Sequence, residues 1–320
     1  MKLLPAALFL LLLLAACAGP ATGPLKGVLV VYPDGFSTEE LNSILDELQL
    51  YVTTVGPETV FDFSVCSMEQ FQDDLRKRRT ILFLAEDPDG IPEELDREEG
   101  NIFFARDVWA SGQVVMGVMI SEDIDWKTVS GRLESAYDQH LYDYIYGSFV
   151  STQMSSPARI DSLLELGFSM DIPKSYSLAE WNAEGGFVQY QRRVSDQCLL
   201  LLSVRWIEDD VVLPPDEAVI WREAVARNHF YDAAADSVDR SMVQVEPLRL
   251  REMEGWKLLG MWRNPEHLNA GAFTSYVLRS DGRRYLLDME VFHEGREKEP
   301  YIREGWLIMN TFIPGVENGQ

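Results

Sequence analysis

Apolar runs and helix-like amphipathic segments alternate along the first half of the chain. Residues 27–32 (GVLVVY) are apolar throughout and rich in β-branched side chains, which is typical of a strand buried on both faces. Ser37 and Glu40 then match a capping box, and Leu41, Ile44, Leu45 and Leu48 recur at helical spacing. The pattern predicts a strand followed by a helix.

The same patterns predict the rest of the first half. We expect strands over residues 59–66, 80–85, 101–106 and 113–120. Ser67 and Gln70 predict a second capped helix that continues through Leu75. A long helix is expected from Trp126 to Ser148, because its apolar and tyrosine side chains recur at helical spacing on one stripe.

The second half contains mostly strand patterns. Early strands are expected over residues 168–172, 187–192 and 197–206, and prolines 214 and 215 open a predicted helix that runs to Phe230. Four strands should follow over residues 241–246, 255–262, 272–280 and 283–291, with Asp281-Gly282 as a hairpin turn between the last two. Residues 299–312 close the chain as an amphipathic helix.

These elements predict an α+β fold with two α/β-type domains. Residues 151–157 (STQMSSP) are small and polar and end in proline, which favours a domain boundary there. We therefore expect an N-terminal domain over residues 27–150 and a C-terminal domain over residues 158–313. The second domain is expected to be an antiparallel sheet sandwiched by helices.

The first residues form a pattern of their own. Lys2 carries a positive charge, residues 3–16 are apolar, and Cys17 follows two alanines. This run is shorter than the roughly 20 residues of a spanning helix but suits a cleaved signal. It resembles a bacterial lipoprotein signal, which implies a signal peptide over residues 1–16 and lipidation of Cys17. An ordinary secretion signal is the alternative, but it would not require the cysteine.

The lipoprotein resemblance implies a place in the cell envelope. Diacylglycerol and an amide-linked acyl chain such as palmitate would anchor Cys17 stably in a lipid bilayer. Residues 17–26 contain two Gly-Pro pairs and would serve as a tether. Because Ala18 rather than aspartate follows the cysteine, the resemblance implies the outer membrane, with the protein facing the periplasm.

Charge and composition narrow the classes of partner. The chain has 52 acidic and 28 basic residues, a formal net charge of −24. Such a surface repels nucleic acid, so we expect no nucleic-acid partner. Cys66 and Cys198 both lie in apolar strand-like runs, where two separate buried thiols are favoured over a disulfide.

No catalytic motif stands out in the sequence. The four histidines lie far apart, and no metal-ligand spacing, phosphate-binding loop or serine-hydrolase signature is present. We therefore expect no cofactor, no metal site and no enzymatic activity. A site assembled from distant residues stays open, and His267, Arg263 and Asp288, or the region near Trp109, are where it would be sought.

Several segments resemble a family of bacterial lipoproteins classified as domain of unknown function 4837. The resemblance rests on these segments: Phe71 with residues 79–82 (RTIL), residues 108–110 (VWA) followed by Gln113, residues 168–173, Gly255-Trp256, residues 271–275 (GAFTS) and residues 301–303 (YIR). That family has no established activity. The element order of the second half also resembles the PsbP and Mog proteins, which implies an accessory binding role.

The sequence thus predicts a membrane-anchored envelope lipoprotein that binds or helps to assemble an envelope protein partner. Arg79, Trp109 and Trp256 are the candidate interaction residues, because exposed arginine and aromatic side chains dominate protein interfaces. Each could instead belong to a core. The alternatives are an envelope hydrolase acting on carbohydrates or esters, and a lipoprotein that binds a small ligand.

Overall fold

The protein is described by a computed structural model covering residues 19–121, 123–147, 162–209, 211–230, 233–280 and 282–315. The predicted signal peptide, Cys17, and the predicted boundary at residues 151–157 lie outside these ranges. Contacts divide the chain into two units. Unit 1 comprises the chain up to Leu50 together with Thr59–His140, and unit 2 comprises Tyr51–Glu58 together with Leu141–Gln320.

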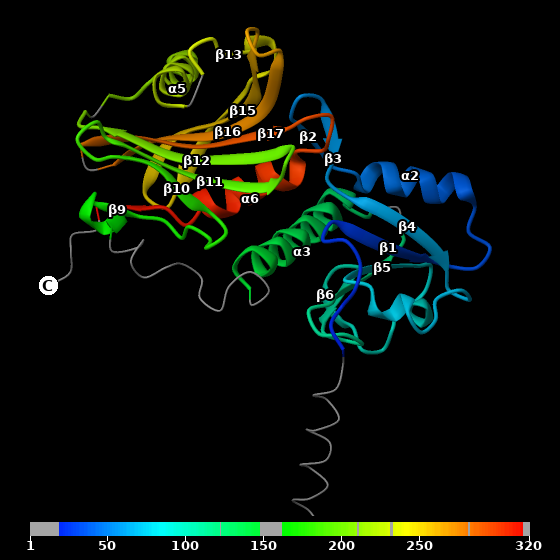
Figure 1. Ribbon diagram of the computed structural model, residues 1–320. Helices are drawn as coiled ribbons and strands as arrows, with labels where there is room; N and C mark the ends of the chain where they lie inside the picture. The colour runs from blue at the N-terminus through cyan, green and yellow to red at the C-terminus, as the bar shows by residue number, and fades with distance from the viewer. Residues whose placement is uncertain are drawn as a thin grey trace, which may run out of the picture. The chain divides into compact units, whose positions relative to one another are not determined.

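Unit 1 is built on a six-stranded mixed sheet (Figure 1). Its strand order is β4-β1-β5-β8-β7-β6, in which the first four strands are parallel and the last two antiparallel. The bounds are β1 (Gly27–Tyr32), β4 (Asp62–Ser67), β5 (Thr80–Ala85), β6 (Asp96–Glu99), β7 (Ile102–Arg106) and β8 (Val114–Met119). β5 is buried along its whole length, as its apolar sequence requires.

Helix α2 (Thr38–Leu48) confirms the predicted capping box. The Ser37 hydroxyl accepts a hydrogen bond from the Glu40 backbone N–H, and the Glu40 carboxylate accepts one from the Ser37 backbone N–H, each at 3.2 Å. The helix buries Leu41, Ile44 and Leu48. Helix α3 (Trp126–Tyr146) is also present where the tyrosine-rich stripe predicted it.

The predicted helix from Ser67 through Leu75 is wrong. Gln70 does accept a hydrogen bond from the Ser67 backbone N–H at 3.1 Å, so half of a capping box forms. Asp73, however, has a φ of 34°, which a right-handed helix excludes. Only the short 3₁₀ helix η1 (Leu75–Lys77) follows, because a short helix is marginal unless packing supports it.

Unit 2 contains an eight-stranded antiparallel sheet with the main path β10-β11-β12-β17-β16-β15-β13, and β14 also pairs with β15. The bounds are β10 (Ser177–Asn182), β11 (Phe187–Ser195), β12 (Cys198–Ile207), β13 (Ser237–Val238), β14 (Gln244–Leu250), β15 (Met253–Asn264), β16 (Asn269–Ser280) and β17 (Arg283–His293). The strands predicted over residues 255–262, 272–280 and 283–291 are confirmed, with longer bounds. The strand predicted over residues 241–246 is displaced to Gln244–Leu250, because Arg240–Met242 forms a 3₁₀ turn. Strand β10 was not predicted.

Two helices cover opposite faces of this sheet, as Figure 1 shows. Helix α5 (Pro215–His229) buries Ala218, Val219, Arg222, Val225 and Ala226, which recur along one helical face. Helix α6 (Glu299–Met309) packs on the other side, against β16 and β17. The predicted α+β class and the sandwiched antiparallel sheet are therefore confirmed.

A glycine lets α6 approach the sheet closely. A Cβ atom added to Gly305 would lie 2.8 Å from the Cβ and Cγ atoms of Met289 on β17. Glu304 precedes this glycine on α6. Its carboxylate accepts hydrogen bonds from Tyr176 at 2.7 Å and from Arg192 at 2.5 Å. Packing and buried polar contacts together hold α6 on the sheet.

Short elements complete the described chain. Strands β2 (Tyr51–Thr53) and β3 (Pro57–Thr59) form a small sheet, and β9 (Phe168–Ser169) pairs with β18 (Ile313–Pro314). The remaining 3₁₀ turns are η2 (Pro88–Gly90) and η3 (Arg240–Met242). Cys66 and Cys198 are buried free thiols. Among the described residues, no helix is both long and apolar enough to cross a membrane.

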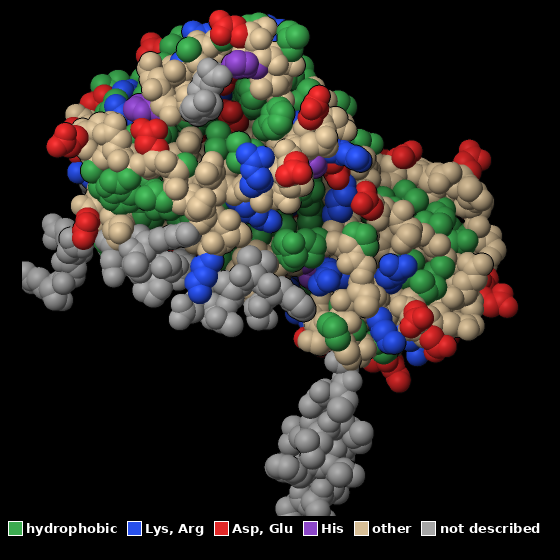
Figure 2. All heavy atoms as spheres, in the orientation of Figure 1, with side chains coloured by type: hydrophobic (Ala, Val, Ile, Leu, Met, Phe, Trp, Pro, Cys, Tyr) green, Lys and Arg blue, Asp and Glu red, His purple; other side chains and the backbone are tan. Residues whose placement is uncertain are grey.

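Acidic side chains are spread over the surface of both units on the face drawn in Figure 2. Most acidic side chains of the described residues are exposed on either face, as the strongly negative composition requires. Buried acidic side chains are therefore the exception. Those that lie nearest to one another are in unit 2.

Candidate functional site

A buried ion cluster joins α5 to the sheet of unit 2. Arg222 Nε and Nη2 donate to the two carboxylate oxygens of Asp288 at 3.1 and 3.2 Å. Arg222 Nη2 also donates to Glu290 Oε2 at 2.6 Å, and the Ser275 hydroxyl donates to Asp288. The Arg222 guanidinium lies 3.9 Å from the centroid of the Phe273 ring. One guanidinium therefore serves two buried carboxyl groups.

Strand register explains why these groups share one face. Ser275 pairs with Asp288, and Phe273 pairs with Glu290, between β16 and β17. Directly opposed residues of antiparallel strands project to the same side of the sheet. All four side chains therefore lie on the face that α5 covers, where Arg222 occupies an otherwise apolar helical stripe.

The cluster is electrostatically unbalanced. Burial raises the pKa of Glu290 to about 8, and the nearby carboxylates of Asp288 and Asp236 add to the effect, although Arg222 opposes it. Burial also raises the pKa of Asp236, against the lowering by its hydrogen bond from Asn264. Glu290 consequently holds a proton more tightly than an ordinary glutamate does.

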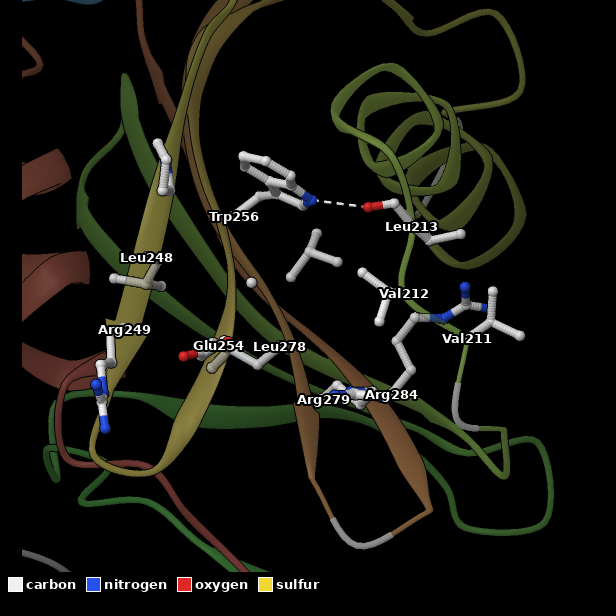
Figure 3. Close-up of a pocket in the computed structure, with 13 residues that line it drawn as sticks. Val211, Val212, Leu213, Leu248, Arg249, Glu254, Trp256, Leu278, Arg279 and Arg284 are labelled. Carbon is white, nitrogen blue, oxygen red and sulfur yellow. Dashed lines mark hydrogen bonds between the residues drawn. The ribbon is translucent and has the colours of Figure 1, made fainter.

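A cavity of about 410 Å³ opens beside Trp256 on the same face, and we call it the Trp256 cavity (Figure 3). The Trp256 indole N–H donates to the Leu213 carbonyl at 2.7 Å. The apolar part of the lining comprises Val211, Val212, Leu213, Pro247, Leu248, Trp256, Val277 and Leu278. Val211 and Val212 are 53% and 64% exposed, so apolar side chains border the opening.

Arginines supply the charge around the Trp256 cavity, which is lined by Arg249, Arg279 and Arg284 together with Glu254. Arg284 Nη2 contacts Asp209 at 2.8 Å, and its guanidinium lies 4.6 Å from the Trp221 ring centroid. Its Nε and Nη1 atoms are buried and have no hydrogen-bond partner among the described residues. Both atoms are closed to solvent, so an anionic group in this cavity accepts from them once the Arg284 side chain turns toward it.

A second cavity of about 280 Å³ lies against Glu290, and we call it the Glu290 cavity. Its lining combines aliphatic, aromatic and polar side chains: Leu199, Leu201, Phe230, Ala233, Asp236, Trp262, Asn264, His267, Asn269, Glu290 and Phe292. Asn264 Nδ2 donates to Asp236 Oδ1 at 2.7 Å and so orients that carboxylate. The polar groups of the Glu290 cavity are thus carboxyl, amide and imidazole groups, whereas arginines predominate among those of the Trp256 cavity.

The predicted interaction residues lie in different units. Trp256, in unit 2, lines the Trp256 cavity. In unit 1, Trp109 packs against Phe71, with ring centroids 5.6 Å apart, and the Arg76 guanidinium lies 5.8 Å from the Trp109 ring. The Arg79 side chain is half-buried and donates to the Ala21 carbonyl at 3.4 Å. Both unit 1 residues thus have internal contacts.

The three residues considered for a catalytic site do not converge. His267 lines the Glu290 cavity. Asp288 is engaged with Arg222 and Ser275 beneath α5. Arg263 follows Trp262 on β15 and therefore projects to the opposite face, where it lies 3.6 Å from Asp239. The structure does not assemble the predicted set of histidine, arginine and aspartate.

The sequence patterns did not single out Arg222, Arg284 or Glu290. A signal for Arg222 was present, because it occupies the position between Val219 and Ala226 on the apolar stripe of α5. Asp288 and Glu290 also alternate with apolar residues on a strand that is buried along most of its length. Charged residues at core positions of both elements could have pointed to a buried cluster.

Comparison with known proteins leaves the family open. No protein-family model matches the chain, and no curated protein matches it. The resemblance to domain of unknown function 4837 therefore stays a prediction.

Solved structures resemble parts of the chain at low identity. CyanoP, the cyanobacterial PsbP of Synechocystis, is 10% identical, and the match covers 47% of this chain and 88% of that protein with a TM-score of 0.34. LpqN, involved in cell envelope biogenesis of Mycobacterium tuberculosis, is 11% identical, with coverages of 46% and 83% and a TM-score of 0.29. A PsbP-like structure is thus among the similar ones.

A protein from Bacteroides thetaiotaomicron is 9% identical with a TM-score of 0.27. The match covers 46% of this chain and 45% of that protein, so the chain spans less than half of its length. TM-scores of this size carry no argument about function, which has to come from the site itself.

Proposed function

We propose that this chain is a non-enzymatic binding protein of the bacterial cell envelope, and that the Trp256 cavity takes an amphipathic ligand with one anionic group. The observation that carries the proposal is the position of Arg284 on an otherwise largely apolar wall. Small-molecule sites combine apolar linings with a few placed polar groups and have volumes of about 300–1,000 Å³. At about 410 Å³, the Trp256 cavity lies within that range.

The two sides of the cavity call for different parts of a ligand. Valine, leucine and tryptophan side chains favour a hydrocarbon segment, because burying it removes apolar surface from water. Arg284 presents two buried N–H donors without a partner among the described residues, and leaving such donors unsatisfied is costly. A carboxylate or phosphate joined to an alkyl chain satisfies both requirements.

A fluorescent fatty acid that carries a dansyl group tests the proposal on the full chain. Saturable binding is expected, and Arg284→Gln should weaken it about tenfold or more because a charge-assisted contact is lost. Val212→Asp places an anion at the exposed border of the cavity and should weaken binding without entering the core.

The matched control is Val194→Asp, which makes the same change at an exposed valine on β11 that does not line the cavity. It should leave binding intact, and the uncharged methyl ester of the probe should bind more weakly than the acid. Equal affinity of acid and ester, or of the Val212 and Val194 variants, contradicts the proposal.

We also propose that Cys17 anchors the protein to a lipid bilayer, with the outer membrane as its location. Support comes from the short apolar run over residues 3–16 and the two alanines before the cysteine. A tethered binding protein would meet its amphipathic ligand close to the membrane that contains such molecules. An envelope protein partner that contacts Arg79 and Trp109 stays a prediction.

A further inference from the structure

The Glu290 cavity is distinct from the Trp256 cavity. Both lie on the sheet face covered by α5, but they adjoin opposite ends of that helix. Leu213, which lines the Trp256 cavity, precedes α5, whereas Phe230, which lines the Glu290 cavity, is its C-cap residue. The buried Arg222 cluster lies beneath the helix between its ends. The two cavities can therefore hold different ligands.

Aromatic side chains form the apolar walls of the Glu290 cavity. Trp262 and Phe230 are 5% and 6% exposed, and the rings of Trp262 and Phe292 have centroids 6.4 Å apart. Aromatic faces attract organic cations through the ring quadrupole, most strongly when water is excluded. These walls therefore suit the methyl or methylene groups next to a positively charged nitrogen.

Carboxyl groups face the same space. Asp236 and Glu290 line the cavity, and the only guanidinium bonded to Glu290 among the described residues is that of Arg222, which also serves Asp288. Arg227, near Asp236, pairs with Glu223 at 3.3 Å. Below about pH 8 Glu290 keeps its proton, and the carboxylates of Asp236 and Asp288 stand against the charge of Arg222. Above that pH Glu290 adds a third negative charge, so the excess of negative charge favours a cationic ligand.

Two buried polar atoms of the lining also have no hydrogen-bond partner among the described residues. They are Asn269 Oδ1, an acceptor, and Trp262 Nε1, a donor. Buried polar groups in native proteins are normally satisfied, so each atom calls for a complementary group. A protonated amine such as that of ethanolamine, but not a quaternary ammonium, can donate to Asn269, and a hydroxyl oxygen can accept from Trp262, where side-chain movement opens these atoms to the cavity.

We propose that the Glu290 cavity is a second binding site, for a small organic ammonium ion that also carries a hydroxyl group. Asp236, Glu290 and Asn269 face the positive charge. Trp262, Phe230 and Phe292 surround the carbon atoms next to the nitrogen. This site is independent of the amphipathic ligand proposed for the Trp256 cavity.

Isothermal titration calorimetry of the full chain with choline and with ethanolamine tests this proposal. The comparison compound is the neutral isostere of choline, in which carbon replaces the quaternary nitrogen, so that size and hydroxyl group are kept and only the charge is lost. At least one of the two cations should bind saturably. Choline should bind about tenfold or more tightly than its isostere, because the cation–π and carboxylate contacts depend on charge.

Asp236→Asn should reduce cation affinity about tenfold, because it removes a carboxylate at nearly constant shape. Glu290→Gln should do the same above about pH 8, where Glu290 has released its proton. Asp196→Asn is the matched control, since it removes the same charge from an exposed hairpin residue. Trp262→Phe provides an independent variant that keeps a core aromatic ring, and it should also weaken binding. Circular dichroism confirms that each variant is folded.

Three results would overturn the site. The first is the absence of saturable binding by either cation. The second is equal affinity for choline and its neutral isostere. The third is a loss of binding in Asp196→Asn as large as that in the folded Asp236 and Glu290 variants, which would assign the effect to the overall charge of the protein.

Discussion

The guanidinium of Arg222 and the carboxylate of Asp288 form a two-pronged ion pair between α5 and β17, with N–O distances of 3.1 and 3.2 Å. Each side chain is 1% exposed. The parallel pair of hydrogen bonds sets the orientation of both groups and so determines how α5 lies over the sheet. The two proposed cavities adjoin the ends of this helix, so the ion pair positions part of both linings.

Replacing Arg222 should be the most destabilising change in this cluster. Arg222→Met keeps much of the side-chain volume but leaves Asp288 and Glu290 buried without their cation, which costs about 3–5 kcal/mol. Urea unfolding followed by circular dichroism measures the change. Arg249→Met is the control, because Arg249 is 3.8 Å from an exposed Glu252, and such surface pairs contribute about 1 kcal/mol or less. Similar losses in both variants would contradict the assigned role.

Glu290 should make stability depend on pH. Burial raises its pKa from 4.5 to about 8, so the folded state binds the proton more tightly than the unfolded state does. The stabilisation is fully present below about pH 4.5 and is lost as pH rises to about 8.

Glu290→Gln removes this titration while the neighbouring charged groups, Arg222, Asp288 and Asp236, stay in place. The free energy of unfolding of the native protein, minus that of the variant, should fall across this pH range and level off above it. A difference that stays constant, or rises, shows that Glu290 does not hold the proton. Unfolding curves measured at a series of pH values provide the data.

Two helical glycines should respond oppositely to alanine. Gly305→Ala brings a Cβ to 2.8 Å from Met289, so overpacking should destabilise unit 2 by about 1–3 kcal/mol. Gly131→Ala, in α3, meets no atom within 4 Å and should stabilise the helix by about 1 kcal/mol. Thermal unfolding compares the two variants. A stabilising Gly305→Ala would mean that α6 does not lie this close to β17.

Cys17→Ala should release the protein from the membrane fraction of a bacterial host. Without the thiol there is no site for diacylglycerol, and the acidic body of the protein has little attraction of its own for an anionic bilayer. Cell fractionation with immunoblotting measures the distribution, and mass spectrometry of the native protein measures the mass of the lipid. Cys66→Ala is the control. Unchanged sedimentation of the Cys17 variant would refute lipid anchoring.

Local patterns predicted the elements whose determinants are close in sequence. The α2 capping box depends on Ser37 and Glu40, three residues apart, and it forms as predicted. The same type of signal at Ser67 and Gln70 did not produce a helix, because Asp73 leaves the helical region of backbone space. Strands β15, β16 and β17 were recognisable because their apolar patterns are long and bounded by turn residues.

Local sequence patterns predicted much less of the candidate sites. The sequence predicts Trp256 as a contact residue for a protein partner. In the fold it lines a cavity whose other walls come from β14, β16, β17 and the segment before α5. His267 was considered together with Arg263 and Asp288. The pairing of β15 with β16 fixes which residues of β15 face α5, and strand alternation then places Arg263 on the opposite face of the sheet.

The amino-acid sequence alone determined the acidic character of the chain and the position of most strands and helices. It also predicts that Cys17 is lipidated. These properties depend on composition or on residues only a few positions apart. Tertiary structure decided which polar groups meet. Arg222 and Asp288 are 66 positions apart, and they pair because the register of β16 and β17 and the packing of α5 bring them to one buried face. No local spacing relates such residues, so the cluster and the cavities beside it appear only in the folded protein.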